Sequence, residues 1–179
     1  MKEKTAADNV QAVSEKDVME MDVEDLLESM EGTESDIKKR LFSLQSVAVQ
    51  RLCEAGREYA SMGLIVAATH GMKELCEGLI QGGAVVDCCH GEPLVRACRC
   101  GKLSTAQLLL EAGACVDGHS GNKYRPLYIA NDRPYPEICL LLLKHNVDVN
   151  VVPQGTVICK ADVLAKMILM GWNKEKEKK

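Results

Sequence analysis

A pattern of small and apolar residues recurs three times between residues 64 and 150, and it limits this chain to a stack of similar units. Each copy has an alanine three positions after an apolar residue, then a leucine-containing segment, then a short turn with an aspartate. The alanine precedes a second marker residue by 17 positions in all three copies, pairing Ala67 with Ala84, Ala97 with Ala114, and Ala130 with Val147. A unit of this length cannot bury its apolar faces alone, so the copies are expected to stack.

Local signals predict two short helices in each copy. Pro93 and Pro126 suit a first helical position, where a missing N–H costs nothing. Gly83 and Gly113 suit the positive φ that follows a second helix. Small residues are expected where the two helices of a copy approach closely. Leucines are expected on the buried face of the second helix. These are Ala67, Ala97 and Ala130, and Leu79, Leu109 and Leu142, respectively.

The segments Pro-Leu-x-x-Ala and Gly-Ala-x-Val-Asp, with the Leu-Leu-Leu run between them, resemble the ankyrin repeat over roughly residues 60–150. The resemblance implies an all-α ankyrin-repeat solenoid of stacked helix-turn-helix units with short β-like fingers. A tetratricopeptide array is the competing helical repeat. It is disfavoured because its small-residue pattern differs and it lacks the Gly-Ala-x-Val-Asp turn.

The chain departs from the family pattern in two ways. The Thr and His that usually form a hydrogen-bonded pair are replaced by Glu92 with Val95 and by Arg125 with Tyr128. Pro134 stands where the other copies have Gly71 and Gly101. We therefore expect modest stability and an altered turn in the third repeat. The period is 30 and then 33 residues, and the three missing residues fall between Asp87 and Pro93, so a stubby finger is expected over residues 87–93.

The expected organisation is one repeat domain between two charged ends. A helix over residues 36–56, with apolar residues on one face, is expected to cap the N-terminal end of the stack. The predicted units are a flexible acidic segment (1–35), a repeat domain (36–173) and a charged tail (174–179). Within the domain they are an N-terminal cap helix or degenerate repeat (36–60), three repeats (61–90, 91–123 and 124–155) and a C-terminal cap helix (156–173).

Charge is unevenly distributed along the chain. Residues 1–36 contain 12 acidic and three basic residues, a net charge of −9, whereas residues 37–179 carry +5. Within the acidic part, apolar residues from Met19 to Met30 form one helical stripe. Three interpretations stay open for this stripe: a solvated tail, a helix packed on the body, or a motif for a partner's groove. A further hypothesis places the acidic segment 15–31 in a basic groove of the stack, in competition with a partner.

Composition argues against several functional classes. No apolar run approaches the 18 residues of a membrane span, and no secretory signal is visible. Six aromatic residues offer little for base stacking, and the body is only mildly basic, so nucleic-acid binding is not expected. Nine cysteines without a signal segment favour reduced thiols and a cytoplasmic, or also nuclear, location.

Two kinds of chemical site have the right residue types in this sequence but lack the required arrangement. Cys88, Cys89 and His90 with Cys98 and Cys100 have the residue types of a zinc site, but the repeat places Cys98 in a buried helix. A cysteine nucleophile with His70, His90, His119 or His145 lacks any orienting group or oxyanion hole. We therefore expect no enzyme activity, no metal and no cofactor.

The resemblance implies a binding surface on the concave side, made by finger tips and the exposed ends of the first helices. Tyr124 and Arg125 are of the residue types enriched at binding hot spots. Arginines and lysines of this region favour an acidic partner. The candidate residues are Thr69, His70, Cys89, His90, Glu92, Arg99, Cys100, His119, Asn122, Tyr124, Arg125, Asp132 and Arg133.

The sequence thus predicts a non-catalytic interaction module that binds a protein or peptide. A monomer is slightly favoured, and the sequence leaves the oligomeric state open. The alternative is a regulatory or scaffold subunit, or a fragment of one. It would act through self-association or through the acidic N-terminal segment.

Overall fold

The computed structural model describes residues 20–29, 45–118, 125–133, 135–152, 156–158, 160–169 and 171. These residues contain helices and turns, and no strand is found among them. The elements are α2 (Val23–Ser29), α4 (Gln45–Ala55), α5 (Arg57–His70), α6 (Lys73–Gln81), α7 (Cys88–Arg99), α8 (Leu103–Glu111), α9 (Pro126–Asp132), α10 (Pro136–Lys144), the 3₁₀ turn η1 (Val149–Val151) and α11 (Ala161–Leu169).

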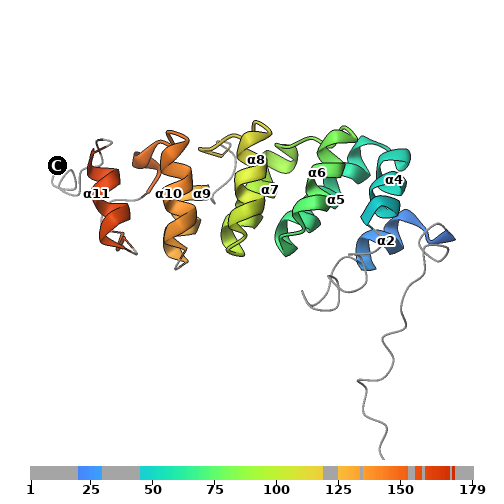
Figure 1. The fold of residues 1–179 in the computed structure, drawn as a ribbon, viewed down its shortest axis with the longest axis horizontal. Coiled ribbons are helices and arrows are strands. Elements are labelled where there is room, and N and C mark those ends of the chain that lie inside the picture. The colour runs from blue at the N-terminus through green and yellow to red at the C-terminus, as the bar shows by residue number, and fades with distance from the viewer. Residues whose placement is uncertain are drawn as a thin grey trace, which may run out of the picture.

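Consecutive helix pairs lie side by side in chain order and form an elongated stack (Figure 1). The pairs are α5 with α6, α7 with α8, and α9 with α10, and the helices of each pair contact one another. Between pairs, α5 contacts α7 and α7 contacts α9, while α4, α6, α8 and α10 make a second row of neighbours. The expected all-α solenoid is confirmed in the described residues.

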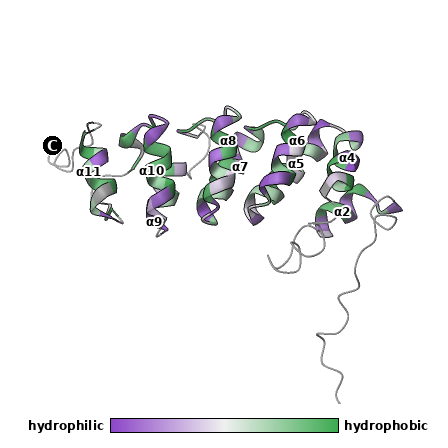
Figure 2. Cartoon of the chain, in the orientation of Figure 1, coloured by the Kyte–Doolittle hydropathy of each residue, from purple (hydrophilic) through white to green (hydrophobic). Residues whose placement is uncertain are grey.

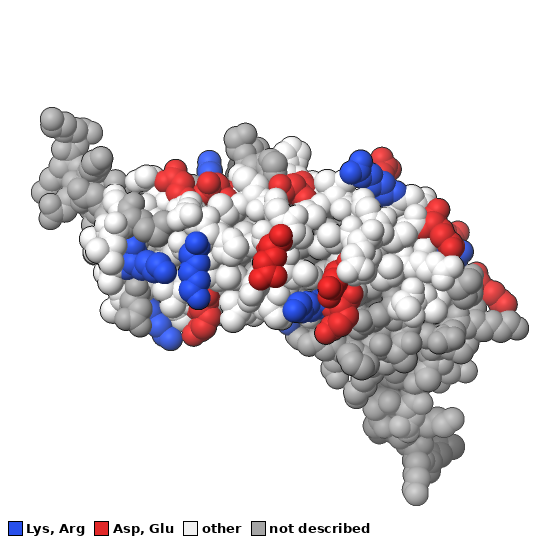
Figure 3. Space-filling view, turned by 45° about the horizontal axis from the view of Figure 1, so that its top comes forward, with Lys and Arg blue, Asp and Glu red and all other residues white. Residues whose placement is uncertain are grey.

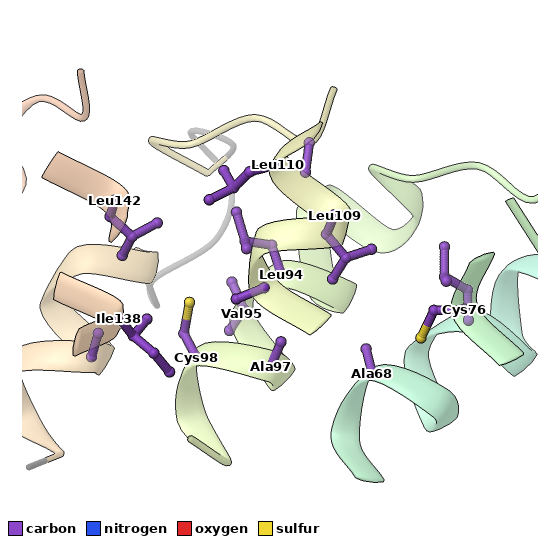
Figure 4. Packing of buried hydrophobic residues seen from close by; sticks show 14 of the residues in the cluster. Ala68, Cys76, Leu94, Val95, Ala97, Cys98, Leu109, Leu110, Ile138 and Leu142 are labelled. Atoms are coloured by element: carbon purple, nitrogen blue, oxygen red, sulfur yellow. The ribbon is translucent and has the colours of Figure 1, made fainter. Parts of the chain in front are cut away.

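The buried layer of the stack contains the residues that the repeat pattern selects. Ala67, Ala97 and Ala130 are fully buried, as are Leu79, Leu109 and Leu142. Hydrophobic and hydrophilic residues occur together on the helices, with the two kinds on different sides (Figure 2). Figure 4 shows Ala97, Cys98, Leu94 and Leu109 directed into the space between neighbouring helices.

Turns between helices follow the expected conformations in the first two repeats. Gly71 and Gly101 both have φ 72°, and Gly83 and Gly113 have φ 95° and 93°. In the third repeat, Asn146 takes the left-handed conformation with φ 58°. Arg133, at the end of α9, is extended with ψ 148°, whereas Cys100 at the same place in the second repeat has ψ 6°. The altered turn expected in the third repeat is therefore present, although Pro134 itself lies outside the described residues.

The finger segments differ from the expected β-like form. The described parts, residues 82–87 and 112–118, consist of turns and irregular backbone. Cys89, His90 and Gly91 all have positive φ, so a left-handed turn precedes the regular part of α7, and Pro93 lies near the start of that part. The finger over 87–93 is short because this tight turn replaces an extended hairpin.

Aspartates of the Val-Asp turns connect neighbouring repeats. The Asp87 carboxylate accepts a hydrogen bond from the backbone N–H of Cys115 at 3.0 Å. Asp117, one repeat later, accepts from the backbone N–H of Asp148 at 2.6 Å. The recurrence of Asp in the pattern thus has a structural cause, because the same position ties each turn to the next one.

The ends of the stack are covered by helices outside the three repeats. At the N-terminal end, α2 contacts α4 and α5, with Leu26 and Leu27 buried. At the C-terminal end, α11 packs on α10 through buried residues such as Val163 and Met167. The expected helix over 36–56 is observed as α4 from Gln45, and residues 36–44 lie outside the described residues.

Two expectations for the acidic segment are wrong for residues 20–29. These residues are not a solvated, flexible stretch, because α2 buries its leucines on the body. They also do not lie in a basic groove at the middle of the stack, because their neighbours are α4 and α5 at its end (Figure 1). The interpretation as a helix packed on the body is the one that agrees with the structure.

Candidate interaction surface

A hollow of about 360 Å³ lies between the ends of α7 and α9. Three of its lining residues, Arg99, Asp132 and Arg133, are among those predicted from the sequence. They meet because α7 and α9 are neighbours in the stack and each helix ends on the same side. Tyr128 and Ile129 complete the lining.

The hollow carries an excess of positive charge. Its lining contains two guanidinium groups and one carboxylate. Nearby on α7, Arg96 forms an ion pair with Glu92 at 2.7 Å, so its charge is compensated locally. Figure 3 shows basic side chains lying close together toward the C-terminal end of the face drawn, with acidic side chains more widely spread. The arrangement is suited to a group with negative charge and a flat apolar neighbour.

Arg125 begins α9 as its N-cap residue, and its guanidinium donates a hydrogen bond to the Asp117 carbonyl at 3.3 Å. The contact ties Arg125 to the preceding turn, so this side chain has a structural role beside the predicted one. Its predicted partners His119, Asn122 and Tyr124 lie outside the described residues.

The other predicted residues of the helix ends do not line this hollow. Thr69 uses its hydroxyl to bond the Ile65 carbonyl within α5, at 2.9 Å. His70 is half-buried as the last residue of α5, and Cys100 is half-buried just after α7. Thr69 and His70 belong to α5, one repeat away from the hollow, whereas Cys100 directly follows Arg99 at the end of α7.

A second hollow of about 430 Å³ lies beside the first finger. Its lining includes the exposed side chains of Met62 and Val85, with 52% and 36% of their surfaces accessible. Cys89 also lines it, whereas His90 on the same turn and Glu92 at the start of the regular helix do not. Sequence reasoning found only Cys89 of this group.

The cysteines of the described residues do not converge on a common centre. Cys98 is buried inside α7, and burial, with a contribution from Cys139, raises the pKa of its thiol far above the ordinary value. Burial likewise raises the pKa of Cys88 to about 12, with Cys89 adding to the effect. In the part of the chain that the structure describes, no three His, Cys, Asp or Glu residues are grouped as metal ligands would be.

Tyr128 and Ile129 were not predicted as site residues. Tyr128 appeared in the sequence only as a departure from the family pattern. A helical signal for it existed, because Tyr128 lies four residues before Asp132 and therefore on the same face of α9. Met62 and Val85 had no such signal, since their exposure depends on how the finger turns away from α5.

A protein-family model for ankyrin repeats, in three copies, matches residues 64–152. Residues 64–152 are ankyrin repeats, and the chain belongs to this family. No curated protein matches the chain at a significant level. Ankyrin repeats are generally protein–protein interaction modules and are typically non-catalytic. None of the helices in the described ranges is long and apolar enough to cross a membrane.

Proposed function

We propose that this ankyrin stack is a non-catalytic module that binds a protein or peptide on the concave side, along the row α5, α7 and α9. The observation that carries the proposal is the hollow formed by Arg99, Asp132 and Arg133 with Tyr128. It lies across a boundary between repeats, where a partner can contact two units of the stack at once.

An acidic segment is the partner chemistry that this hollow favours. Two guanidinium groups against one carboxylate leave a positive excess, whatever ion pairs form within the lining. A guanidinium group binds a carboxylate through two parallel hydrogen bonds, and the Tyr128 ring offers an apolar surface beside it. We propose a peptide with an Asp or Glu next to an apolar side chain.

The alternative role, as a regulatory subunit acting through its acidic N-terminal segment, has less support. The apolar side of residues 20–29 is already occupied by α4 and α5. A cytoplasmic or nuclear setting is also a proposal, supported by the lack of disulfide bonds among the cysteines in the described residues.

Site-specific photocrosslinking tests which row of helices binds. A photoreactive amino acid is placed at Asp132, beside the hollow, and in a separate variant at Gln107, which is exposed on α8. We expect crosslinked protein from position 132 in cell extract, and competition by excess unlabelled chain. Crosslinks from position 107 alone would show that the partner binds the other row of helices.

A further inference from the structure

The contact between α2 and the stack has a polar edge around Tyr59. The Tyr59 hydroxyl donates a hydrogen bond to the Glu24 carboxylate at 2.6 Å, in an exposed setting. Just before α2, the Met21 carbonyl accepts a hydrogen bond from the Arg51 guanidinium of α4 at 2.6 Å. These two hydrogen bonds join residues 21–24 to α5 and α4. We call them, together with α2, the latch.

The apolar part of the latch is small. Leu26 and Leu27 have 1% and 8% of their surfaces accessible, while Val23 is only partly buried. A helix of seven residues has little stability of its own, so its position depends on these leucines and on the two polar bonds. A modest change in the polar bonds therefore has a large effect on the population of the docked state.

The surroundings of the phenol oxygen are acidic. Glu24, Asp22 and Glu58 all act on it, and the hydrogen bond to Glu24, with the charges of these groups, raises the pKa of Tyr59. A neutral phenol is tolerated there because its hydroxyl donates a hydrogen bond to the Glu24 carboxylate. A dianionic group on the same oxygen has no proton to donate and meets like charge on α2 and on α5.

We propose that Tyr59 is a phosphorylation site whose phosphoryl group releases α2 from the stack. An ATP-dependent tyrosine kinase supplies the group: the phenol oxygen forms a bond to the γ-phosphorus, the bond to the ADP oxygen breaks, and the phenol proton is lost. Phosphate then repels the carboxylates of Glu24 and Asp22. Release opens the apolar seat of Leu26 and Leu27 on α4 and α5.

Hydrogen–deuterium exchange on the full chain tests the release, with phosphotyrosine incorporated at position 59 during synthesis. We expect amides of α2 to exchange at least about tenfold faster than in the unmodified chain, the effect of an added like-charge contact. Amides of α8, at the middle of the stack, should be unchanged. Equal protection of α2 in the two chains, or slower exchange in the phosphorylated one, would overturn the proposal.

Two variants separate charge from loss of a hydrogen bond. Tyr59→Phe removes the bond to Glu24 without adding charge, and we expect it to accelerate exchange in α2 less than phosphorylation does. Glu24→Gln in the phosphorylated chain removes one opposing carboxylate and should restore part of the protection. A Tyr59→Phe effect as large as that of phosphorylation would contradict the electrostatic mechanism.

A kinase assay tests whether the site is accessible. The full chain is incubated with a broad-specificity tyrosine kinase and ATP, and the modified tyrosine is located by mass spectrometry. Phosphate on Tyr59 supports the proposal. Phosphate confined to Tyr124, Tyr128 or Tyr135 would exclude Tyr59 as a substrate of the folded chain.

Discussion

Two glycines with similar backbone conformations differ in how much stability the stack should lose when they are substituted. Gly101 and Gly113 both have positive φ, at 72° and 93°. A side chain at Gly101 would meet the Tyr135 ring at 2.6 Å, whereas one at Gly113 would meet nothing within 4 Å. The difference arises because the residue before α10 covers the first-helix turn of the preceding repeat.

Alanine at these two glycines should therefore separate backbone strain from crowding. Gly113→Ala should lower the free energy of unfolding by about 1 kcal/mol, the cost of a left-handed residue with a side chain. Gly101→Ala should cost about 1–3 kcal/mol more, because the Tyr135 ring has to move. Urea denaturation of both variants measures the difference, and equal losses would show that the ring moves freely.

The thiols provide a second test at the scale of residues. Cys89 is exposed, whereas burial raises the pKa of Cys76 and of Cys88 to about 12. Because the thiolate is the reactive form, a thiol with that pKa has about one molecule in ten thousand ionised at pH 8.

Alkylation with iodoacetamide at pH 8 should accordingly label Cys89 first, as located by mass spectrometry. Labelling of Cys76 and Cys88 should accelerate as the pH rises toward 12, or when the chain unfolds. Rapid labelling of Cys76 in the native chain at pH 8 would contradict its buried position in α6.

At the scale of elements, the stack is held together by turns as well as by helix faces. Asp87 and Asp117 occupy the same place in successive repeats, and each accepts a backbone hydrogen bond from the next turn. Because the acceptor is charged, such a bond is stronger than a neutral one.

Asp87→Ala should lower the free energy of unfolding by about 1.5–3 kcal/mol, since it leaves the Cys115 N–H without this acceptor. Asp87→Asn keeps an acceptor oxygen and should lose less. Denaturant titration gives both values, and hydrogen exchange at Cys115 reports the local effect. If the asparagine variant lost as much as the alanine variant, the carboxylate would have another structural role.

The elements also show where sequence periodicity stops being informative. Repeats predicted the helix pairs well, because alanines and leucines recur at positions that pack identically in each unit. The left-handed turn at residues 89–91 was not predicted, because two of its three residues are not glycine. Tertiary packing of the shortened finger overrides their local preference.

For the whole molecule, the proposed acidic partner predicts that the binding affinity depends on ionic strength and on the positive charges of the hollow. Exposed ion pairs weaken as salt screens them, so the affinity for the partner found by crosslinking should fall as ionic strength rises. The double change Arg99→Gln with Arg133→Gln should weaken binding by roughly tenfold. Fluorescence anisotropy with a labelled partner peptide measures both effects.

The double change Lys73→Gln with Lys144→Gln supplies the matched control, because it removes two positive charges at exposed positions of α6 and α10, outside the lining of the hollow. We expect its affinity to stay within about twofold of the unchanged chain. A similar loss in the control and in the arginine variant would indicate attraction by overall charge and not by the hollow.

The repeat, the helix pairs and the identity of the buried alanines and leucines were readable from the residues alone. The reason is that small size, helix preference and positive φ are local properties, and their recurrence with the same spacing inside each unit leaves one way to stack the units. Tertiary structure decided which side chains meet across repeats. The hollow between α7 and α9 and the seat of α2 join residues about 30 or more positions apart, and only packing brings such residues together.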